Sequence, residues 1–560
     1  VEAGWSRMRE RKDTETRAMV YACAAQLFWA YLFRCHEGTN PTQRRLDAFF
    51  GLCLPPVRTA VSPTDVCVDS CVDMLSAALY RQFEYTYPLI LDMLRHTSLD
   101  KKSAPAVFQP DLLQPVRMCI AIRSVARTRH YYVCGEMPSL PGAALPSMEE
   151  LAIEPEGPVT FPNAHVEQVQ MQLDAVMTQI ALHCDYLLKE LTVLDGQVPL
   201  APGTNAPHLP TTPGSEPFEV RSHAQGAFTV AYAAEHQPYL DLLRTCIETW
   251  PRCMSHSVSK ATCHSLLFRG LFCVEPRVQQ ASAAALSRIA RGGEGAHSIL
   301  RALLQWLFRK DGVVWELQSH ADVLVAQFAQ VADVMVSLLE LCGTATPPPD
   351  ELETGAWLLL CVPSSVLRHR TTRLLLHHTS LSEFYTKFFM RPCTDFIDQS
   401  TSSQLSASQR ARIAKWRDAG SAYPLNRLAS SSENGTLWSA ALPRVLQHLE
   451  QRAPHLTEQL YVLLLGAVQR LEPSMASIAR LRKGTAQVPL TLTFLRQIWR
   501  MYVLALCTVC RAHTQHIALL MPYLVCDDYD LQSTAAEALS HCHALAYPTL
   551  VSALSHLFDN

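Results

Sequence analysis

The sequence has few of the residues that mark a disordered, nucleic-acid-binding or sheet-rich protein. Only 18% of its 560 residues are charged and 48% are hydrophobic, against roughly 25% charged in an average globular protein, which excludes a disordered tail. The 48 Lys and Arg are balanced by 51 Asp and Glu. Because binding to phosphate backbones needs a surplus of basic residues, we predict no nucleic-acid partner. Glycine is also low, at 21, which disfavours folds with many tight turns.

Long apolar runs are missing as well. The apolar run over 18–33 is interrupted by Gln26 and is shorter than the ~20 residues that cross a bilayer, so it predicts a buried helix and no transmembrane segment. No signal peptide is visible in the charged first 17 residues. Many of the 19 cysteines, such as Cys23, Cys273 and Cys342, fall in apolar helical segments. This usage predicts reduced thiols in a cytoplasmic protein. The chain begins with Val1, which indicates a fragment of a longer protein.

What the sequence does contain is helical periodicity interrupted by proline. Prolines recur through 137–162 and 196–217, and because proline blocks helix continuation, both segments are predicted to be loops or disordered inserts. Between them, 164–194 carries apolar residues at helical spacing and predicts one long helix. A Ser/Thr/Gln-rich stretch at 399–409 indicates a polar linker. No convincing run of strand-like alternation is found, so the predicted fold class is all-α.

Three segments, 275–286, 363–374 and 528–539, share one register. Each has a polar or proline turn, a branched apolar residue and a leucine eight positions later. Eight residues is a little over two helical turns, so both apolar side chains face the same way. A helical hairpin of this kind buries its apolar stripe only by stacking on others. The pattern therefore predicts an α-solenoid of HEAT- or armadillo-like hairpins.

The predicted organisation follows from these interruptions. We expect N-terminal helical repeats over 1–135 and Pro-rich inserts around the long helix over 136–220. HEAT-like repeats should occupy 221–398, followed by the linker at 399–409. Further repeats should fill 410–560 and continue beyond the fragment.

Motifs for catalysis are missing. The sequence has no phosphate-binding loop ending in Gly-Lys-Ser/Thr, no His-Glu-x-x-His, no set of kinase loops and no Gly-x-Ser-x-Gly elbow. We therefore predict that the protein is not an enzyme and needs no cofactor. Distant residues can still converge in a fold, so an unrecognised enzyme stays open as an alternative.

One group of residues has the ligand types of a zinc site, namely Cys507, Cys510, His513 and His516. On a single helix, steps of three residues rotate by about 300° each, so the four side chains would spread over half the circumference. The sequence therefore predicts no metal site, but two buried thiols followed by polar histidines. Residues 541–543, His-Cys-His, are interpreted in the same way, because adjacent residues diverge on a helix.

Two basic clusters are candidate protein-binding patches. The residues are Arg368, Arg370 and Arg373 in one segment and Arg410, Arg412, Lys415 and Arg417 in another. Either cluster could bind an acidic partner or a phosphorylated segment. The alternative is an ordinary solvated helix face.

Five segments occur in a distinctive order along 260–550. They read CHSLLFRG at 263–270, ETGAWLLLC at 353–361, TLW with LPR at 436–444, WRMYVLALCT at 499–508 and EAL at 537–539. Their order resembles the N-terminal region of fungal members of the Furry family of cell morphogenesis proteins. The first 135 residues resemble the start of that family more loosely, through 21–33 and 71–94.

The resemblance implies a non-catalytic scaffold that supports an NDR-type kinase and its Mob coactivator in polarised growth, cell shape and cell separation. It also implies a place at the cell cortex or at sites of growth, and a chain much longer than 560 residues. A solenoid suits this role, because its long surface holds partners close together. The family's motifs transfer no partner-contacting residue to this sequence. The alternatives are another HEAT-repeat scaffold, in trafficking, cohesin loading or nuclear transport, and an unrecognised enzyme.

Overall fold

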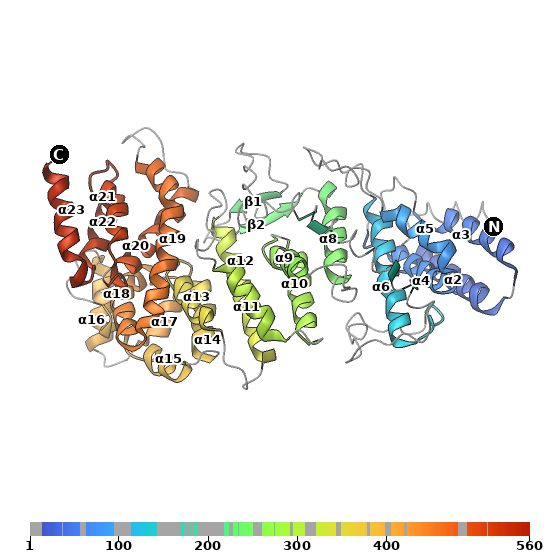
Figure 1. Ribbon diagram of the computed structural model, residues 1–560, viewed down its shortest axis with the longest axis horizontal. Coiled ribbons are helices and arrows are strands. Elements are labelled where there is room, and N and C mark those ends of the chain that lie inside the picture. The colour runs from blue at the N-terminus through green and yellow to red at the C-terminus, as the bar shows by residue number, and fades with distance from the viewer. Residues whose placement is uncertain are drawn as a thin grey trace. The chain divides into compact units, whose positions relative to one another are not determined.

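The structure is a computed structural model (Figure 1). The chain divides into two compact units, unit 1 over 1–294 and unit 2 over 295–560. It describes residues 14–35, 37–55, 63–94, 114–142, scattered positions within 168–188, 218–222, 228–232, 234–249, 260–273, 275–291, 295–308, 321–342, 349–377, 381–397, 405–418, 423–479, 490–511 and 513–559. The five-part organisation expected from the sequence concerns blocks of repeats rather than compact units, and it stays a prediction.

The described part of unit 1 is a stack of helices with one small sheet. Its helices are α2 (Thr14–Arg34), α3 (Thr39–Cys53), α4 (Val66–Arg81), α5 (Phe83–Leu94), α6 (Pro115–Cys134), η5 (Ala234–His236), α8 (Gln237–Thr249), α9 (Lys260–Leu271) and α10 (Pro276–Ile289). Alternate helices pack in succession, α2 on α4, α4 on α6, α6 on α8 and α8 on α10. This order is what stacked helical hairpins produce, and it confirms the predicted fold class.

Unit 2 is also built of stacked helical hairpins. Its helices are α11 (Ala296–Leu307), α12 (Ala321–Cys342), α13 (Asp350–Leu360), α14 (Ser365–His377), α15 (Ser382–Phe389), η8 (Cys393–Asp395), α16 (Ala407–Asp418), α17 (Leu425–Ser430), α18 (Gly435–Arg452), α19 (Pro454–Ala479), α20 (Leu490–Thr508), α21 (Gln515–Leu524), α22 (Tyr529–Ser540), η10 (Ala544–Ala546) and α23 (Tyr547–Asp559). Neighbours such as α13 and α14 or α21 and α22 form hairpins, and α18, α20 and α22 pack in succession.

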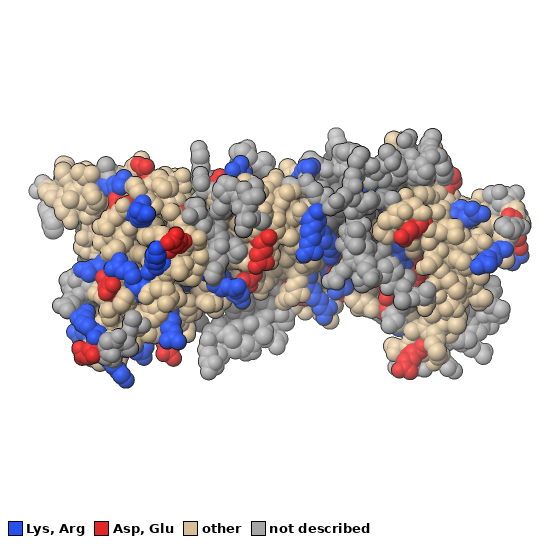
Figure 2. Space-filling view, turned by 90° about the horizontal axis from the view of Figure 1, so that it is seen from below, with Lys and Arg blue, Asp and Glu red and all other residues tan. Residues whose placement is uncertain are grey.

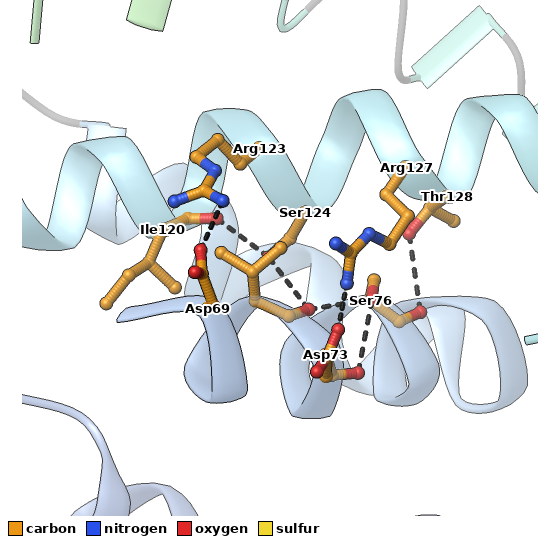
Figure 3. Close-up of polar contacts among 9 residues, drawn as sticks. Asp69, Asp73, Ser76, Ile120, Arg123, Ser124, Arg127 and Thr128 are labelled. Atoms are coloured by element: carbon orange, nitrogen blue, oxygen red, sulfur yellow. Dashed lines mark hydrogen bonds and ion pairs between the residues drawn. The ribbon is translucent and has the colours of Figure 1, made fainter. Parts of the chain in front are cut away.

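Polar contacts join α4 and α6 across the core of unit 1 (Figure 3). Two ion pairs lie one helical turn apart, Arg123 with Asp69 and Arg127 with Asp73. The hydroxyl of Thr128 donates to the carbonyl of Ser76 at 3.3 Å, and neither residue is more than 1% exposed. Burial raises the pKa of Asp73 even though Arg127 opposes that change. Arg127 thus keeps the buried carboxylate of Asp73 compatible with this interface, whereas the side chain of Asp69 is 60% exposed.

The expectation of a chain without strands is wrong at one place. Strands β1 (Phe218–Ser222) and β2 (Phe228–Tyr232) form an antiparallel pair with Val220 opposite Val230. Aromatic or valine residues stand at alternate positions, Phe218 and Val220 in β1 and Phe228, Val230 and Tyr232 in β2, which is the period of a strand. Each strand is only five residues long, and β1 directly follows the Pro-rich stretch 196–217, so the pattern is easily missed between helices.

The predicted inserts lie mainly outside the described residues, which include 137–142 of the first insert but neither 143–162 nor 196–217. Within the long helix expected over 164–194, every described position is helical. Val169, Val176, Cys184 and Leu187 are buried there. The end of the expected linker at 399–409 is helical instead, because α16 begins at Ala407. Among the helices that the structure describes, none combines the length and apolar character needed to span a bilayer.

The register shared by three segments holds in two of them. In α10, Val278 and Leu286 are fully buried, and in α22, Leu531 is buried and Leu539 is 5% exposed. Both helices begin at the predicted turn. Pro276 occupies the first turn of α10, and the carboxylate of Asp528 accepts a hydrogen bond from the Leu531 amide at the start of α22.

In the third segment, α14, the first core residue lies one position later than predicted. Val366 is 58% exposed, whereas Leu367 is completely buried. Leu374 is still buried, so it lies seven positions after the first core residue rather than eight. The prediction for Val366 is therefore wrong, and the shift decides where the arginines of this helix lie.

Candidate functional site

The predicted basic patch on α14 does not form one surface. Arg368 is 0% exposed. Its Nη1 donates to the carbonyl of Val362 and its Nε to the carbonyl of Ala429, both at 2.8 Å. The guanidinium carbon lies 5.9 Å from the ring centroid of Trp438. The prediction that Arg368 belongs to an exposed protein-binding patch is wrong.

The hairpins of α9 with α10 and of α21 with α22 explain why the position of Arg368 is buried. Each has a glutamine directly after its first core residue, and that glutamine reaches the end of the preceding helix. Gln279 Nε2 donates to the carbonyl of Leu271 at 2.6 Å, and Gln532 Nε2 to that of Leu524 at 2.8 Å. The last carbonyls of a helix have no partner within it, so such a side chain closes the hairpin. Arg368 takes the place of this glutamine in α14, because it too directly follows the first core residue and donates to a carbonyl at the end of the preceding helix.

The positive charge of Arg368 is stabilised by carbonyl groups at helix ends and not by a carboxylate. Among the described residues no carboxylate pairs with it. Val362 follows the end of α13, and Ala429 lies near the end of α17; helix C-termini carry partial negative charge. Burial lowers the pKa of Arg368 to about 10, so the group stays protonated at neutral pH. Arg368 is a structural residue that ties α14 to α13 and α17.

Arg370 and Arg373 complete the predicted set on α14. Nη1 of Arg370 lies 2.8 Å from Oδ1 of Asp333 on α12, and the two side chains are 38% and 43% exposed. This ion pair neutralises part of the charge that the sequence assigned to the patch. Arg373 is exposed and makes no ion pair with a described residue. Of the three arginines, only Arg373 offers a guanidinium to a ligand.

Arg373 borders a cleft of about 530 Å³ between α14 and α17, which we call the basic groove. The groove is lined by His369, Thr372, Arg373, Leu376, Tyr423, Asn426, Arg427, Ser430 and Ser431. Arg427 is exposed like Arg373. The groove therefore combines two guanidinium groups with an aromatic wall and neutral hydrogen-bonding groups. Sequence reasoning missed Arg427 and Tyr423, because neither stands in a cluster of like residues.

The polar wall of the groove has one unmatched acceptor. Oδ1 of Asn426 is buried without a hydrogen-bond partner. Nδ1 of His369 and Oγ of Ser430 lie 3.1 Å apart. The Ser430 hydroxyl donates to the carbonyl of Asn426 at 2.8 Å, so it accepts from the histidine. This serine is hydrogen-bonded as a structural group and is not arranged to lose its proton to His369.

The second predicted patch lies on the surface of α16. Arg410, Arg412, Lys415 and Arg417 are all exposed. Arg412 Nη1 donates to Oδ1 of Asn434 at 2.6 Å and lies 3.9 Å from a carboxylate oxygen of Glu433. Figure 2 shows Lys and Arg side chains gathered on the face of unit 2, at the left of that view. The structure thus places these four residues where a partner could reach them.

Helix α16 also contacts the wall of the basic groove. The rings of Trp416 and Tyr423 stack at 4.3 Å with an interplanar angle of 6°. Trp416 is half-buried, so this stacking holds α16 beside a residue that lines the groove. The two predicted basic clusters are therefore linked through one aromatic pair, although the sequence separates them by more than one helix.

The segment 507–516 is not a single helix. Helix α20 ends at Thr508, Arg511 has a φ of +42°, and α21 begins at Gln515. Cys507, Cys510, His513 and His516 therefore do not lie on one straight helix, and the prediction that all four diverge is wrong. His513 does turn away, and its ring stacks on Tyr461 at 4.5 Å.

The remaining residues of that segment converge with Cys542, which follows α22. The ligand atoms of Cys507, His516 and Cys542 all lie within 4.8 Å of one another. His516 Nε2 is 3.4 Å from the Cys542 sulfur. Contact with Cys542 and burial raise the pKa of Cys510, and contact with Cys507 raises that of Cys542. Of the neighbouring histidines, His543 instead accepts a hydrogen bond from the Leu545 amide.

Comparison with known proteins gives one informative match. A family model described as the cell morphogenesis N-terminal domain matches residues 1–341, which is more than half of the chain. The segments that carried the resemblance lie mostly over 260–550, so the match extends it to the N-terminal helices. No curated protein sequence matches. The crystal structure of an engineered protein matches at 11% identity over 96% of this chain and 98% of that chain, with a TM-score of 0.21 that carries no argument.

Proposed function

Since the chain belongs to the cell morphogenesis family, we propose that it acts in that process as a non-catalytic scaffold for an NDR-type kinase and its Mob coactivator. The family membership itself supports a morphogenesis-related role, and it agrees with the family expected from the sequence. The scaffold would work in the cytoplasm, at the cell cortex or at sites of polarised growth.

The family match is the observation that carries this proposal, and the stacked hairpins support it. A stack of helices offers a long surface on which several proteins can be held at high effective concentration. The basic groove supports binding rather than catalysis. Its serine and histidine are hydrogen-bonded as described above, and among the residues that line it there is no carboxylate to orient the histidine.

We propose that the basic groove takes an acidic or phosphorylated segment of a partner. Arg373 and Arg427 present two guanidinium groups, which bind carboxylates and phosphates through paired N–H donors. The Tyr423 ring adds apolar contact beside them. The surface of α16 is the alternative binding site, because its basic residues are equally exposed.

The test is recovery of the tagged full-length protein from its own cells, followed by mass spectrometry of the proteins that accompany it. An NDR-type kinase and a Mob protein among the leading partners would support the proposal. Coat, cohesin-loading or transport factors in their place would leave the helical stack standing and overturn the morphogenesis scaffold.

Charge reversal locates the binding surface. The double variant Arg373→Glu/Arg427→Glu changes the groove, and Arg410→Glu/Arg417→Glu makes the same change of charge on α16. We expect the groove variant to lose the kinase and Mob protein while the α16 variant keeps them. Loss with the α16 variant alone would move the binding site to that helix.

A further inference from the structure

We propose that Cys507, Cys510, His516 and Cys542 bind a structural zinc ion that locks the C-terminal hairpins of unit 2 together. The four residues come from three places in the chain. Cys507 lies in the last turn of α20 with Cys510 in the turn that follows, His516 lies at the start of α21, and Cys542 follows α22. This proposal is independent of the scaffold role.

The spacing of the ligand atoms fits a tetrahedral ion. Zinc binds cysteine sulfur at about 2.3 Å, which places two sulfurs of one tetrahedron about 3.8 Å apart. The ligand atoms of Cys507, His516 and Cys542 already lie within 4.8 Å of one another, and His516 Nε2 is 3.4 Å from the Cys542 sulfur. A small movement of side chains brings all three to the distances that zinc requires.

Cys510 supplies the fourth ligand. Its thiol contacts the side chains of Cys542 and His516 but lies outside the group whose ligand atoms are all within 4.8 Å of one another, so its side chain must move to complete the site. Cys507 and Cys510 have the Cys-x-x-Cys spacing common in structural zinc sites. The backbone amide of His543 donates to the Cys510 sulfur at 3.4 Å, a contact that also stabilises a metal-bound thiolate.

A neighbouring side chain fixes the orientation of the histidine. The Tyr461 hydroxyl lies 3.3 Å from Nδ1 of His516, and Tyr461 is 2% exposed. With Nδ1 in this hydrogen bond, Nε2 faces Cys542 and is left for the metal. Histidines that bind metals generally use their second nitrogen in such a contact.

The surroundings indicate a structural rather than a catalytic site. Cys507, Cys510 and His516 are 0% exposed and Cys542 is 4% exposed. Four protein ligands fill a tetrahedral coordination sphere and leave no open position for a substrate. Three sulfurs and one imidazole nitrogen in this geometry favour zinc over magnesium, calcium or manganese, which prefer oxygen ligands.

The first experiment measures metal in the purified chain, prepared without chelator, by inductively coupled plasma mass spectrometry. We expect one zinc per chain, retained through gel filtration. Absence of zinc, together with failure to take up added Zn²⁺ or Co²⁺ after reduction, would overturn the proposal. A disulfide between Cys507 and Cys542 in the native chain, found by non-reducing peptide mapping, would overturn it too.

Substitutions then assign the ligands. His516→Ala and Cys542→Ser should lose the zinc, whereas Cys361→Ser should keep it. Cys361 is a matched control, because it is a fully buried thiol of the same unit that hydrogen-bonds to the carbonyl of Trp357. Equal metal content in His516→Ala and the wild type would remove His516 from the site and overturn the proposed ligand set.

If the ligand variants fail to fold, two further measurements still test the site on folded protein. Cobalt exchanged into the wild-type chain should show intense sulfur-to-metal charge-transfer bands with the visible spectrum of a tetrahedral ion. Bands typical of octahedral oxygen ligation would contradict the site. Tyr461→Phe removes only the supporting hydrogen bond and should weaken zinc binding about 10–100-fold, and unchanged affinity would show that the Tyr461 contact does not serve a metal ligand.

Discussion

Helix α14 and the segment 507–516 show two ways in which a helix boundary decides where side chains lie. The first was expected to present three arginines to solvent, yet Arg368 is fully buried. The second was expected to scatter its cysteines and histidines, yet Cys507 and His516 meet at Cys542. In both cases the outcome depends on where a helix begins or ends, and not on its faces.

The two segments differ in how much the helix boundary changes: one residue of register in α14, and a complete break between two helices in 507–516. In α14 the helix is continuous, and a shift of one residue brings Leu367 rather than Val366 into the core. In 507–516 the helix stops at Thr508 and a new one starts at Gln515. A one-residue shift moves one side chain from surface to core, whereas a break lets residues on separate helices meet.

The largest effect is expected from removing the metal. Structural zinc sites contribute apparent binding free energies of about 10–16 kcal/mol in small domains, so its loss should strongly destabilise the elements that it joins. In hydrogen exchange with a strong chelator, α20, α21 and α22 should lose protection while α4 and α6 keep theirs. Equal protection of α20 to α22 with and without chelator would contradict the role of the ion.

The next largest effect is expected at Arg368. Arg368→Ala removes two hydrogen bonds of a charged group, each contributing about 1.5–3 kcal/mol, so unfolding in denaturant should show a loss of about 3–6 kcal/mol. Arg368→Gln should recover part of it, because glutamine closes the hairpins of α10 and α22. Arg373→Ala, an exposed change on the same helix, should stay within about 0.5 kcal/mol. Similar losses for the two alanine variants would refute the burial of Arg368.

A smaller effect is expected at Gly355, on the helix that Arg368 closes. A Cβ at this position would clash with the ring of Phe308, so α13 or the ring must move. Gly355→Ala should cost about 1–3 kcal/mol, as overpacking does. A matched change to alanine at Gly435, where nothing lies within 4 Å, should not destabilise. The comparison is made by thermal unfolding, and a neutral Gly355→Ala would show that this packing is loose.

The smallest effect on stability is expected from the exposed arginines. Arg373→Glu/Arg427→Glu and Arg410→Glu/Arg417→Glu should each leave the free energy of unfolding within about 1 kcal/mol, because exposed charges contribute little. Their difference should appear only in partner binding. A large loss of stability in the groove variant would mean that Arg373 or Arg427 is structural, like Arg368, and thermal unfolding would reveal it.

Much of the fold followed from the sequence because repeated local patterns encode it. The apolar spacing of α10 and α22 predicted their buried faces, and the order of motifs around Trp357, Trp438 and Trp499 pointed to the family. The hairpin of β1 and β2 did not follow, since two five-residue strands give a weak signal.

The sites were harder to predict because they depend on residues that meet only in the fold. Arg427 and Tyr423 carry no local signal, yet they complete the groove beside Arg373. Cys542 lies 26 residues beyond His516, across a whole hairpin. Sequence spacing could show the ligand types in 507–516, but not the break between two helices that lets them converge.

The claim that residues from three separate elements form one site is tested most directly by X-ray absorption at the zinc edge of the purified chain. We expect three sulfur neighbours at about 2.3 Å and one nitrogen at about 2.0–2.1 Å. A zinc ion surrounded by oxygen and nitrogen alone, or a chain that carries no zinc, would contradict it.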